Sequence, residues 1–154
     1  LEPSGKDRKT FLRLKWAFGL AAIALSAYGF NALREPGISW EAYTDARLAD
    51  AKAQGKPVML DFYADWCIPC LELDRKTFTD AGVMSAAEEF VRLKVDLTHF
   101  DSPESEALRQ EFAIAGVPTI VFLDRSGNEA KASRVVGYLP PEEFLQKLQP
   151  LLVK

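Results

Sequence analysis

Residues 58–70 read VMLDFYADWCIPC, an apolar run that ends in two cysteines three positions apart. The apolar run, residues 57–64, is typical of a strand that is covered on both faces at the centre of a sheet. After it, through residues 71–78, the apolar residues take up helical spacing. We therefore expect Cys67 and Cys70 at the junction between a central strand and a helix.

The rest of the domain alternates between helical and strand patterns. Strands are predicted at residues 57–64, 91–95, 117–123 and 133–137, and further helices at 40–54, 102–112 and 140–152. Ser39 and Ser102 are the expected N-caps of the first two of these helices. Alternation that ends in a hairpin around residues 124–128 indicates an α/β fold, with a mixed sheet and helices on both faces.

Composition limits the class of protein. The 154 residues are 48% hydrophobic, which suits one globular domain. The formal net charge is −3 and argues against a nucleic-acid binder. The charge is unevenly distributed, because residues 1–15 carry a net +3 and residues 16–154 a net −6.

Residues 16–33, WAFGLAAIALSAYGFNAL, are 18 consecutive residues without a charge. As a helix they would cover about 27 Å, close to the roughly 30 Å of a bilayer core. The basic flank at residues 1–15 would stay in the cytoplasm by the positive-inside rule. We expect a transmembrane helix at 16–33 and a linker at 34–39. A domain at 40–154 would then lie in the periplasm of a bacterium.

Two other interpretations of this run stay open. A cleaved signal peptide also has a basic start, an apolar stretch and small residues near its end, as at Ala24, Ser26 and Ala27. A buried core helix is the other, although the remaining residues already supply a core.

The two cysteines are too few for a disulfide-stapled scaffold. At the start of a helix, the thiolate of Cys67 would be stabilised by the helix N-terminus. Cys67 would attack a partner's disulfide, and Cys70 would then release the partner. Trp66 would shelter the site, and Pro69 would make the turn rigid.

A zinc half-site and a pair of inert core cysteines are the alternatives for Cys67 and Cys70. Structural zinc needs four ligands, and His99 is the one further strong candidate. We therefore expect no metal and no cofactor other than the disulfide itself. His99 is expected to be a loop residue.

The stretch from 58 to 70 resembles the active-site strand and turn of thioredoxins, and GVPT at 116–119 resembles their cis-proline loop. More narrowly, four motifs together are similar to the C-terminal domain of DsbD-type thiol:disulfide interchange reductases: GKPVMLD at 55–61, YADWC at 63–67, KTF at 76–78 and VGY at 136–138. The resemblance covers about residues 40–150. It implies a thioredoxin fold in which Trp66, Val117 and Pro118 meet the partner.

The resemblance also implies a place in electron transfer. In that family a final transmembrane helix precedes this domain, which fits residues 11–33. Electrons from cytoplasmic thioredoxin cross a membrane domain, reach this periplasmic domain and pass to an N-terminal periplasmic domain, which reduces disulfide isomerases and cytochrome c maturation proteins. Ile68 and Pro69 are closer to thioredoxin itself. A free-standing anchored thioredoxin for cytochrome c maturation is therefore an alternative, and a redox-silent module that holds peptides is another.

Two acids stand near the cysteines in the sequence. Asp61 lies in the apolar strand, where an acid is costly without a partner or a role. Thioredoxins have a buried acid there, implicated in proton transfer to the second cysteine; a water-facing strand end is the alternative. Asp74 shares the helix face of the cysteines, or is a solvated acid beside Arg75 and Lys76. We expect Asp61 and Asp74 to raise the pKa of Cys67.

Overall fold

The computed structural model describes residues 15–16, 18–19, 22–23, 25–26 and 37–152. The chain divides into two units, Leu1–Pro36 and Gly37–Lys154. The described residues of the first unit are helical. Within the described ranges, no helix has the length and apolar character needed to cross a membrane. Most of the predicted transmembrane segment, its basic flank and half of the linker lie outside these ranges.

The second unit is built on a mixed five-stranded sheet in the order β1-β3-β2-β4-β5. Strands β1 and β2 run parallel to β3, whereas β4 runs antiparallel to both β2 and β5. The strands are β1 (Glu41–Ala42), β2 (Val58–Tyr63), β3 (Val91–Asp96), β4 (Thr119–Leu123) and β5 (Val135–Val136). The predicted central strand is therefore confirmed as β2.

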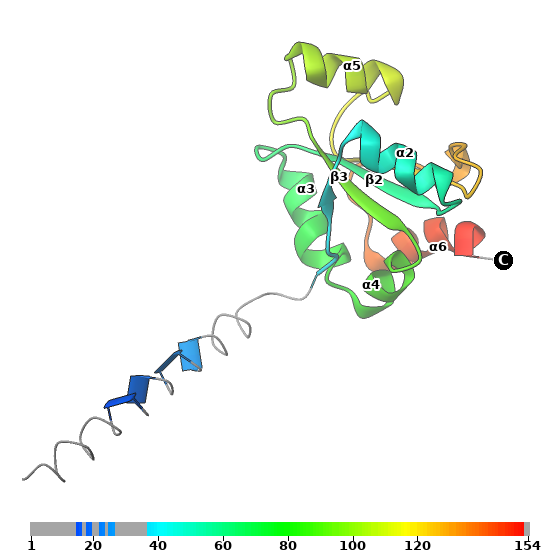
Figure 1. Ribbon diagram of the computed structural model, residues 1–154. Helices are drawn as coiled ribbons and strands as arrows, with labels where there is room; N and C mark the ends of the chain where they lie inside the picture. The colour runs from blue at the N-terminus through cyan, green and yellow to red at the C-terminus, as the bar shows by residue number, and fades with distance from the viewer. Residues whose placement is uncertain (1–14, 17, 20–21, 24, 27–36, 153–154) are drawn as a thin grey trace, which may run out of the picture. The chain divides into compact units, whose positions relative to one another are not determined.

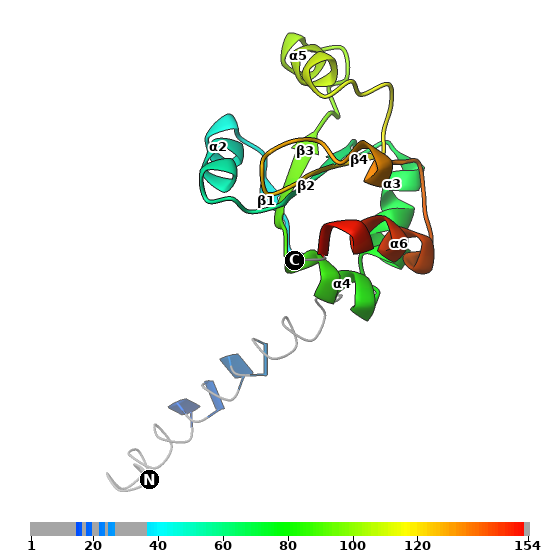
Figure 2. The same ribbon diagram turned by 90° about the vertical axis from the view of Figure 1, so that its right-hand side faces the viewer.

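Helices cover both faces of this sheet, as Figures 1 and 2 show. One face carries α2 (Asp45–Ala53) and α5 (Pro103–Glu111). The other carries α3 (Ile68–Glu72), its π-helical continuation η1 (Leu73–Thr77), α4 (Ala81–Ala87) and α6 (Pro141–Leu152). A 3-10 turn, η2 (Lys131–Ser133), precedes β5. This arrangement confirms the expected α/β class.

Strand β2 contributes to two separate cores because its side chains alternate between the faces. Leu60 and Phe62 pack in the core under α2 and α5, together with Leu93 of β3. Met59 packs in the other core, with Phe122 of β4 and other apolar side chains. All residues of β2 except the last are buried, which explains its nearly continuous apolar sequence.

The first predicted helix begins later than expected, so Ser39 is not its cap. Its first residues form the edge strand β1, which pairs with β3. Helix α2 follows Thr44, whose side chain accepts a hydrogen bond from the Arg47 N–H at 3.1 Å. Only Leu48 and Ala51 of α2 are buried, so its weak apolar pattern did not mark the boundary.

Three further differences concern short elements. Helix α4, AGVMSAA, was not predicted; its small residues leave little pattern, and it is capped by Asp80, which accepts hydrogen bonds from Gly82 and Val83. Strand β4 begins only at Thr119, after the cis peptide bond between residues 117 and 118. The fourth predicted strand shrinks to the two residues of β5.

Candidate active site

The two cysteines form a disulfide at the end of β2, with an S–S distance of 2.09 Å. Cys67 is the N-cap of α3, and its Sγ accepts a hydrogen bond from the Cys70 N–H at 3.2 Å. The predicted strand–helix junction is thus confirmed. Both residues are buried, with 3% and 4% exposure, so exposure does not distinguish them. Position does, because only Cys67 receives a backbone N–H at the helix start, which favours its thiolate.

The predicted proline loop lies against this disulfide. Val117 and Tyr63 pack on the small cluster formed by Ala64 and the two cysteines. The peptide bond from Val117 to Pro118 is cis, as the resemblance implied. The Pro118 carbonyl accepts a hydrogen bond from the Gly137 N–H at 2.9 Å, which ties the loop to the end of β5.

Trp66, the residue before Cys67, is 58% exposed. Its indole N–H donates to the Thr98 carbonyl at 3.0 Å, and its ring meets that of Phe100 edge to face at 6.2 Å. The neighbouring Asp65 N–H donates to the Thr98 hydroxyl, which donates back to the Asp65 carboxylate. Thr98 therefore holds the residues just before Cys67 in place. No sequence pattern marks Thr98, because it lies 33 positions from Asp65 in the chain.

Asp61 is buried, with 2% exposure, so the interpretation that it faces water is wrong. Burial raises its pKa to about 7. Lys94, whose Nζ lies 3.6 Å from Oδ2, opposes this shift, and the charge of Asp74 adds to it. A carboxyl group that titrates near neutral pH can take up or release a proton under ordinary conditions.

Lys94 joins the two acids into one network, which no sequence pattern marks. Its ammonium group contacts both carboxylate oxygens of Asp74, at 2.8 and 2.9 Å, and lies over the ring of Tyr63 at 4.6 Å. Asp74 itself is partly exposed, with 35% of its side chain accessible, and is paired with Lys94. Asp74 comes from the π-helical segment η1, and Lys94 is the β3 residue paired in register with Asp61.

No group of three or more His, Cys, Asp or Glu side chains among the described residues could hold a metal ion. His99 is exposed in the loop after β3, as expected.

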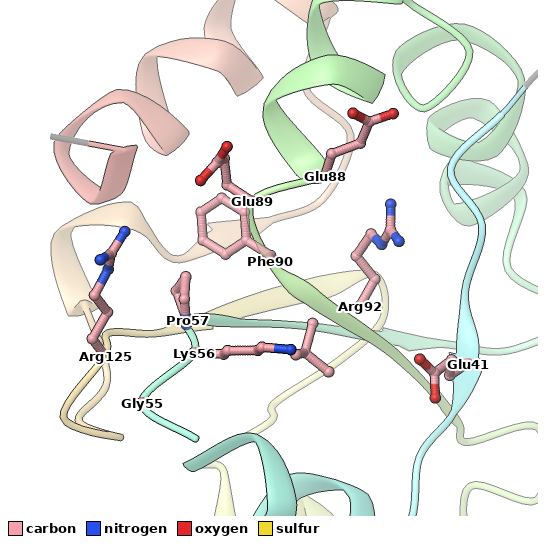
Figure 3. Close-up of a pocket in the computed structure, with 10 residues that line it drawn as sticks. Glu41, Gly55, Lys56, Pro57, Glu88, Glu89, Phe90, Arg92 and Arg125 are labelled. Carbon is pink, nitrogen blue, oxygen red and sulfur yellow. The ribbon is translucent and has the colours of Figure 1, made fainter. Parts of the chain in front are cut away.

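Two hollows lie at opposite ends of the sheet. One, of about 580 Å³, adjoins Trp66 and the loop after β3. The other, of about 460 Å³, lies where β2 and β3 begin, next to Pro57 and Phe90. Figure 3 shows that its charged side chains, Lys56 and Arg125 among them, point in different directions. The disulfide follows the far end of β2, and of these two hollows only the first is lined by a residue next to it in the sequence, Trp66.

The comparisons with known proteins agree with this geometry. A family model described as a thioredoxin-like domain matches residues 44–151. The chain belongs to the thioredoxin-like domain family. The match includes the strand, both cysteines and the proline loop described above.

Two individual relatives show which kind of thioredoxin-like domain this chain resembles. The DsbD thiol:disulfide interchange proteins of Yersinia enterocolitica and Actinobacillus pleuropneumoniae are 48% and 46% identical over 66% and 64% of this chain. The chain spans only 17% of the length of either relative. These matches, together with the structural one below, confirm the resemblance to a DsbD-type domain.

Two solved structures are similar in fold. The oxidised C-terminal domain of Neisseria meningitidis DsbD superposes with a TM-score of 0.62 at 28% identity, covering 73% of this chain and 99% of that one. A thioredoxin from Thermus thermophilus gives 0.61 at 30% identity, covering 77% and 89%.

Substituting Asp61→Asn is expected to stabilise the domain, and more at pH 8 than at pH 5. The folded carboxyl holds its proton up to about pH 7, whereas the unfolded one ionises near pH 4. The free energy of unfolding of the wild type therefore falls as pH rises between these values. The stabilisation by Asp61→Asn should be larger at pH 8 than at pH 5 by about 2–3 kcal/mol, and urea unfolding at both pH values measures it.

The control for this measurement is Asp50→Asn, which changes an exposed aspartate of α2. It is expected to shift stability equally at both pH values. An equal shift for Asp61→Asn as well would contradict the role of Asp61 as a buried, proton-holding group.

Changes to Lys94 and Asp74 are expected to move the pKa of Asp61 in opposite directions. Lys94→Met removes a nearby cation and should raise this pKa above about 7, whereas Asp74→Asn removes a negative charge and should lower it. Titration of the Asp61 carboxyl carbon by NMR measures both shifts. Lys76→Met, which breaks the exposed pair with Glu72, is the control and should leave the titration unchanged. If neither Lys94→Met nor Asp74→Asn moves it, the network does not act on Asp61.

Proposed function

We propose that this domain is a thiol-disulfide oxidoreductase that works as a protein-disulfide reductase. The observation that carries the proposal is the Cys67–Cys70 disulfide at the start of α3, packed against Val117 beside a cis-proline. The similarity to DsbD domains supports the direction of transfer.

The reaction proceeds in two exchanges and needs no cofactor beyond the cysteine pair. In the reduced domain the Cys67 thiolate attacks one sulfur of the partner's disulfide, and the partner's other sulfur leaves as a thiolate. Cys70 then attacks Cys67, which frees the partner. Two electrons and two protons pass to the partner, and the domain returns to its disulfide form, to be reduced again by an upstream dithiol.

Asp61 is proposed to take the proton of Cys70 as that thiol becomes the nucleophile. Its carboxyl titrates near neutral pH and is buried on β2, which suits this task. The charges of Asp61 and Asp74 are also proposed to raise the pKa of the Cys67 thiol. Asp74 contributes less, because Lys94 balances its charge.

Residues 16–33 are proposed to anchor the chain in a bacterial inner membrane, with residues 34–39 as linker and the domain at 40–154 in the periplasm. The uncharged run and the basic flank before it support this topology. The proposed electron donor is a membrane electron-transfer domain. The proposed acceptors are an N-terminal periplasmic domain, a disulfide isomerase or cytochrome c maturation proteins. The proposed contact surface for them comprises Trp66, Val117 and Pro118.

A second candidate is a free-standing anchored thioredoxin that serves cytochrome c maturation. Pro69 before the second cysteine and the similarity to a Thermus thermophilus thioredoxin favour it. Both candidates use the same chemistry and differ only in what feeds and receives the electrons.

The Cys70→Ser variant is expected to accumulate a mixed disulfide with a partner, whereas Cys67→Ser should trap almost none. Without Cys70 the first exchange occurs but the release step cannot. Non-reducing gel electrophoresis after rapid acid quenching measures the trapped complex.

Equal trapping by both variants would contradict this division of roles between Cys67 and Cys70. Insulin reduction by dithiothreitol is the companion assay, and the wild type should accelerate it while Cys67→Ser should not. No acceleration by the wild type would favour the redox-silent binding module.

A phosphatase fused after Lys154 is expected to be active in the periplasm, because the basic flank keeps the start of the chain in the cytoplasm. The protein should stay in the membrane fraction after a carbonate wash. Recovery of a soluble form shortened by roughly 27 residues would instead indicate a cleaved signal peptide.

A further inference from the structure

One hollow is lined by Trp66, the residue that directly precedes Cys67 in the chain, although neither cysteine lines it. Its volume is about 580 Å³, enough to admit a side chain of another protein. Its wall is formed by the exposed indole and the loop after β3: Trp66, Thr98, His99, Phe100, Asp101 and Ser102.

Hydrogen bonds hold this wall in position. The indole N–H of Trp66 is bonded to the Thr98 carbonyl, and the Thr98 N–H donates to Asp96 Oδ1 at 2.8 Å. At the far end, Ser102 caps α5 by accepting a hydrogen bond from the Ser105 N–H at 3.1 Å. Because the loop is anchored at both ends, the hollow is formed before a partner arrives, and little ordering is needed on binding.

The charged groups on and beside this hollow are mainly acidic. Asp101 lines it and is exposed, and the exposed acids Asp65 and Asp96 flank the same loop through their bonds to Thr98. Hydrogen bonds from Thr98 hold the pKa of Asp96 below its usual value, so it stays ionised.

Positive charge near the hollow does not cancel this. Arg109 stacks on the ring of Phe100 at 3.8 Å, but it pairs with Glu106 at 3.0 Å. His99, which also lines the hollow, is exposed. The entrance therefore has a negative character next to an exposed aromatic ring.

We infer that this hollow is a subsite for a lysine or arginine side chain that flanks the reacting cysteine of the partner protein. The methylene stem would lie on the indole of Trp66, and the cationic group would meet the carboxylate of Asp101. An acidic residue would be repelled, and an apolar one would cover Asp101 without pairing its charge. The inference rests on the proposed function, because it names the kind of partner that the reductase prefers.

The test uses three short peptides, each closed by one disulfide and differing only in the residues on both sides of one cysteine: lysine, norleucine or glutamate. The full chain in detergent is reduced with dithiothreitol, freed of the excess, and mixed with each peptide. The second-order rate of peptide reduction is expected to be roughly fivefold higher for lysine than for norleucine at low salt, and lowest for glutamate. This preference should shrink as salt is added.

Asp101→Asn is expected to bring the lysine peptide down to the norleucine rate, and Asp101→Lys to favour the glutamate peptide. Glu104→Gln is the matched control; it neutralises an exposed acid in the first turn of α5, outside the hollow, and should keep the lysine preference.

Each outcome bears on a different claim. Equal rates for the lysine and norleucine peptides in the wild type would overturn the inference while leaving the reductase intact. A lysine preference that survives in Asp101→Asn would also overturn it, because the preference would arise elsewhere. Failure to reduce any of the three peptides would instead overturn the proposed function.

Discussion

The burial of β2 on both faces is the constraint from which the site follows. Paired with β3 on one edge and β4 on the other, this strand has no route to solvent until it ends, and Cys67 begins α3 just beyond that end. The same burial forces Asp61 into an apolar setting, where an ionised carboxylate is costly. A rigid redox motif and a carboxyl that titrates near pH 7 are thus two consequences of one strand.

Lys94 makes that burial tolerable. An acid buried on the central strand of the sheet needs a cation, and the residue paired with Asp61 on β3 supplies one. Lys94 is shared, because it bonds more closely to Asp74 than to Asp61. The sharing leaves Asp61 only partly compensated, so its pKa stays high enough for proton transfer near neutral pH.

The sequence predicted what is local and strongly patterned. The central strand, the cysteine junction and the Ser102-capped helix α5 are where residue spacing placed them, since each has a long apolar run or a clear cap. Strand β1 is too short to show a period, and α4 is made of small residues. The roles of Lys94 and Thr98 could not be predicted for a different reason. The role of Lys94 depends on strand register, and that of Thr98 depends on a contact between residues 33 positions apart.

The surroundings of the disulfide differ from side to side. Towards Val117 and the cis-proline the contacts are apolar and carry no charge, so this side offers no charged group by which partners could be told apart. Towards Trp66 the surface is aromatic and flanked by acids, and Thr98 holds it in place. Thiol exchange needs only the first kind of contact, because its chemistry is the same for every disulfide. Discrimination among partners requires a contact whose strength varies with the partner's residues, and the Trp66 side supplies it.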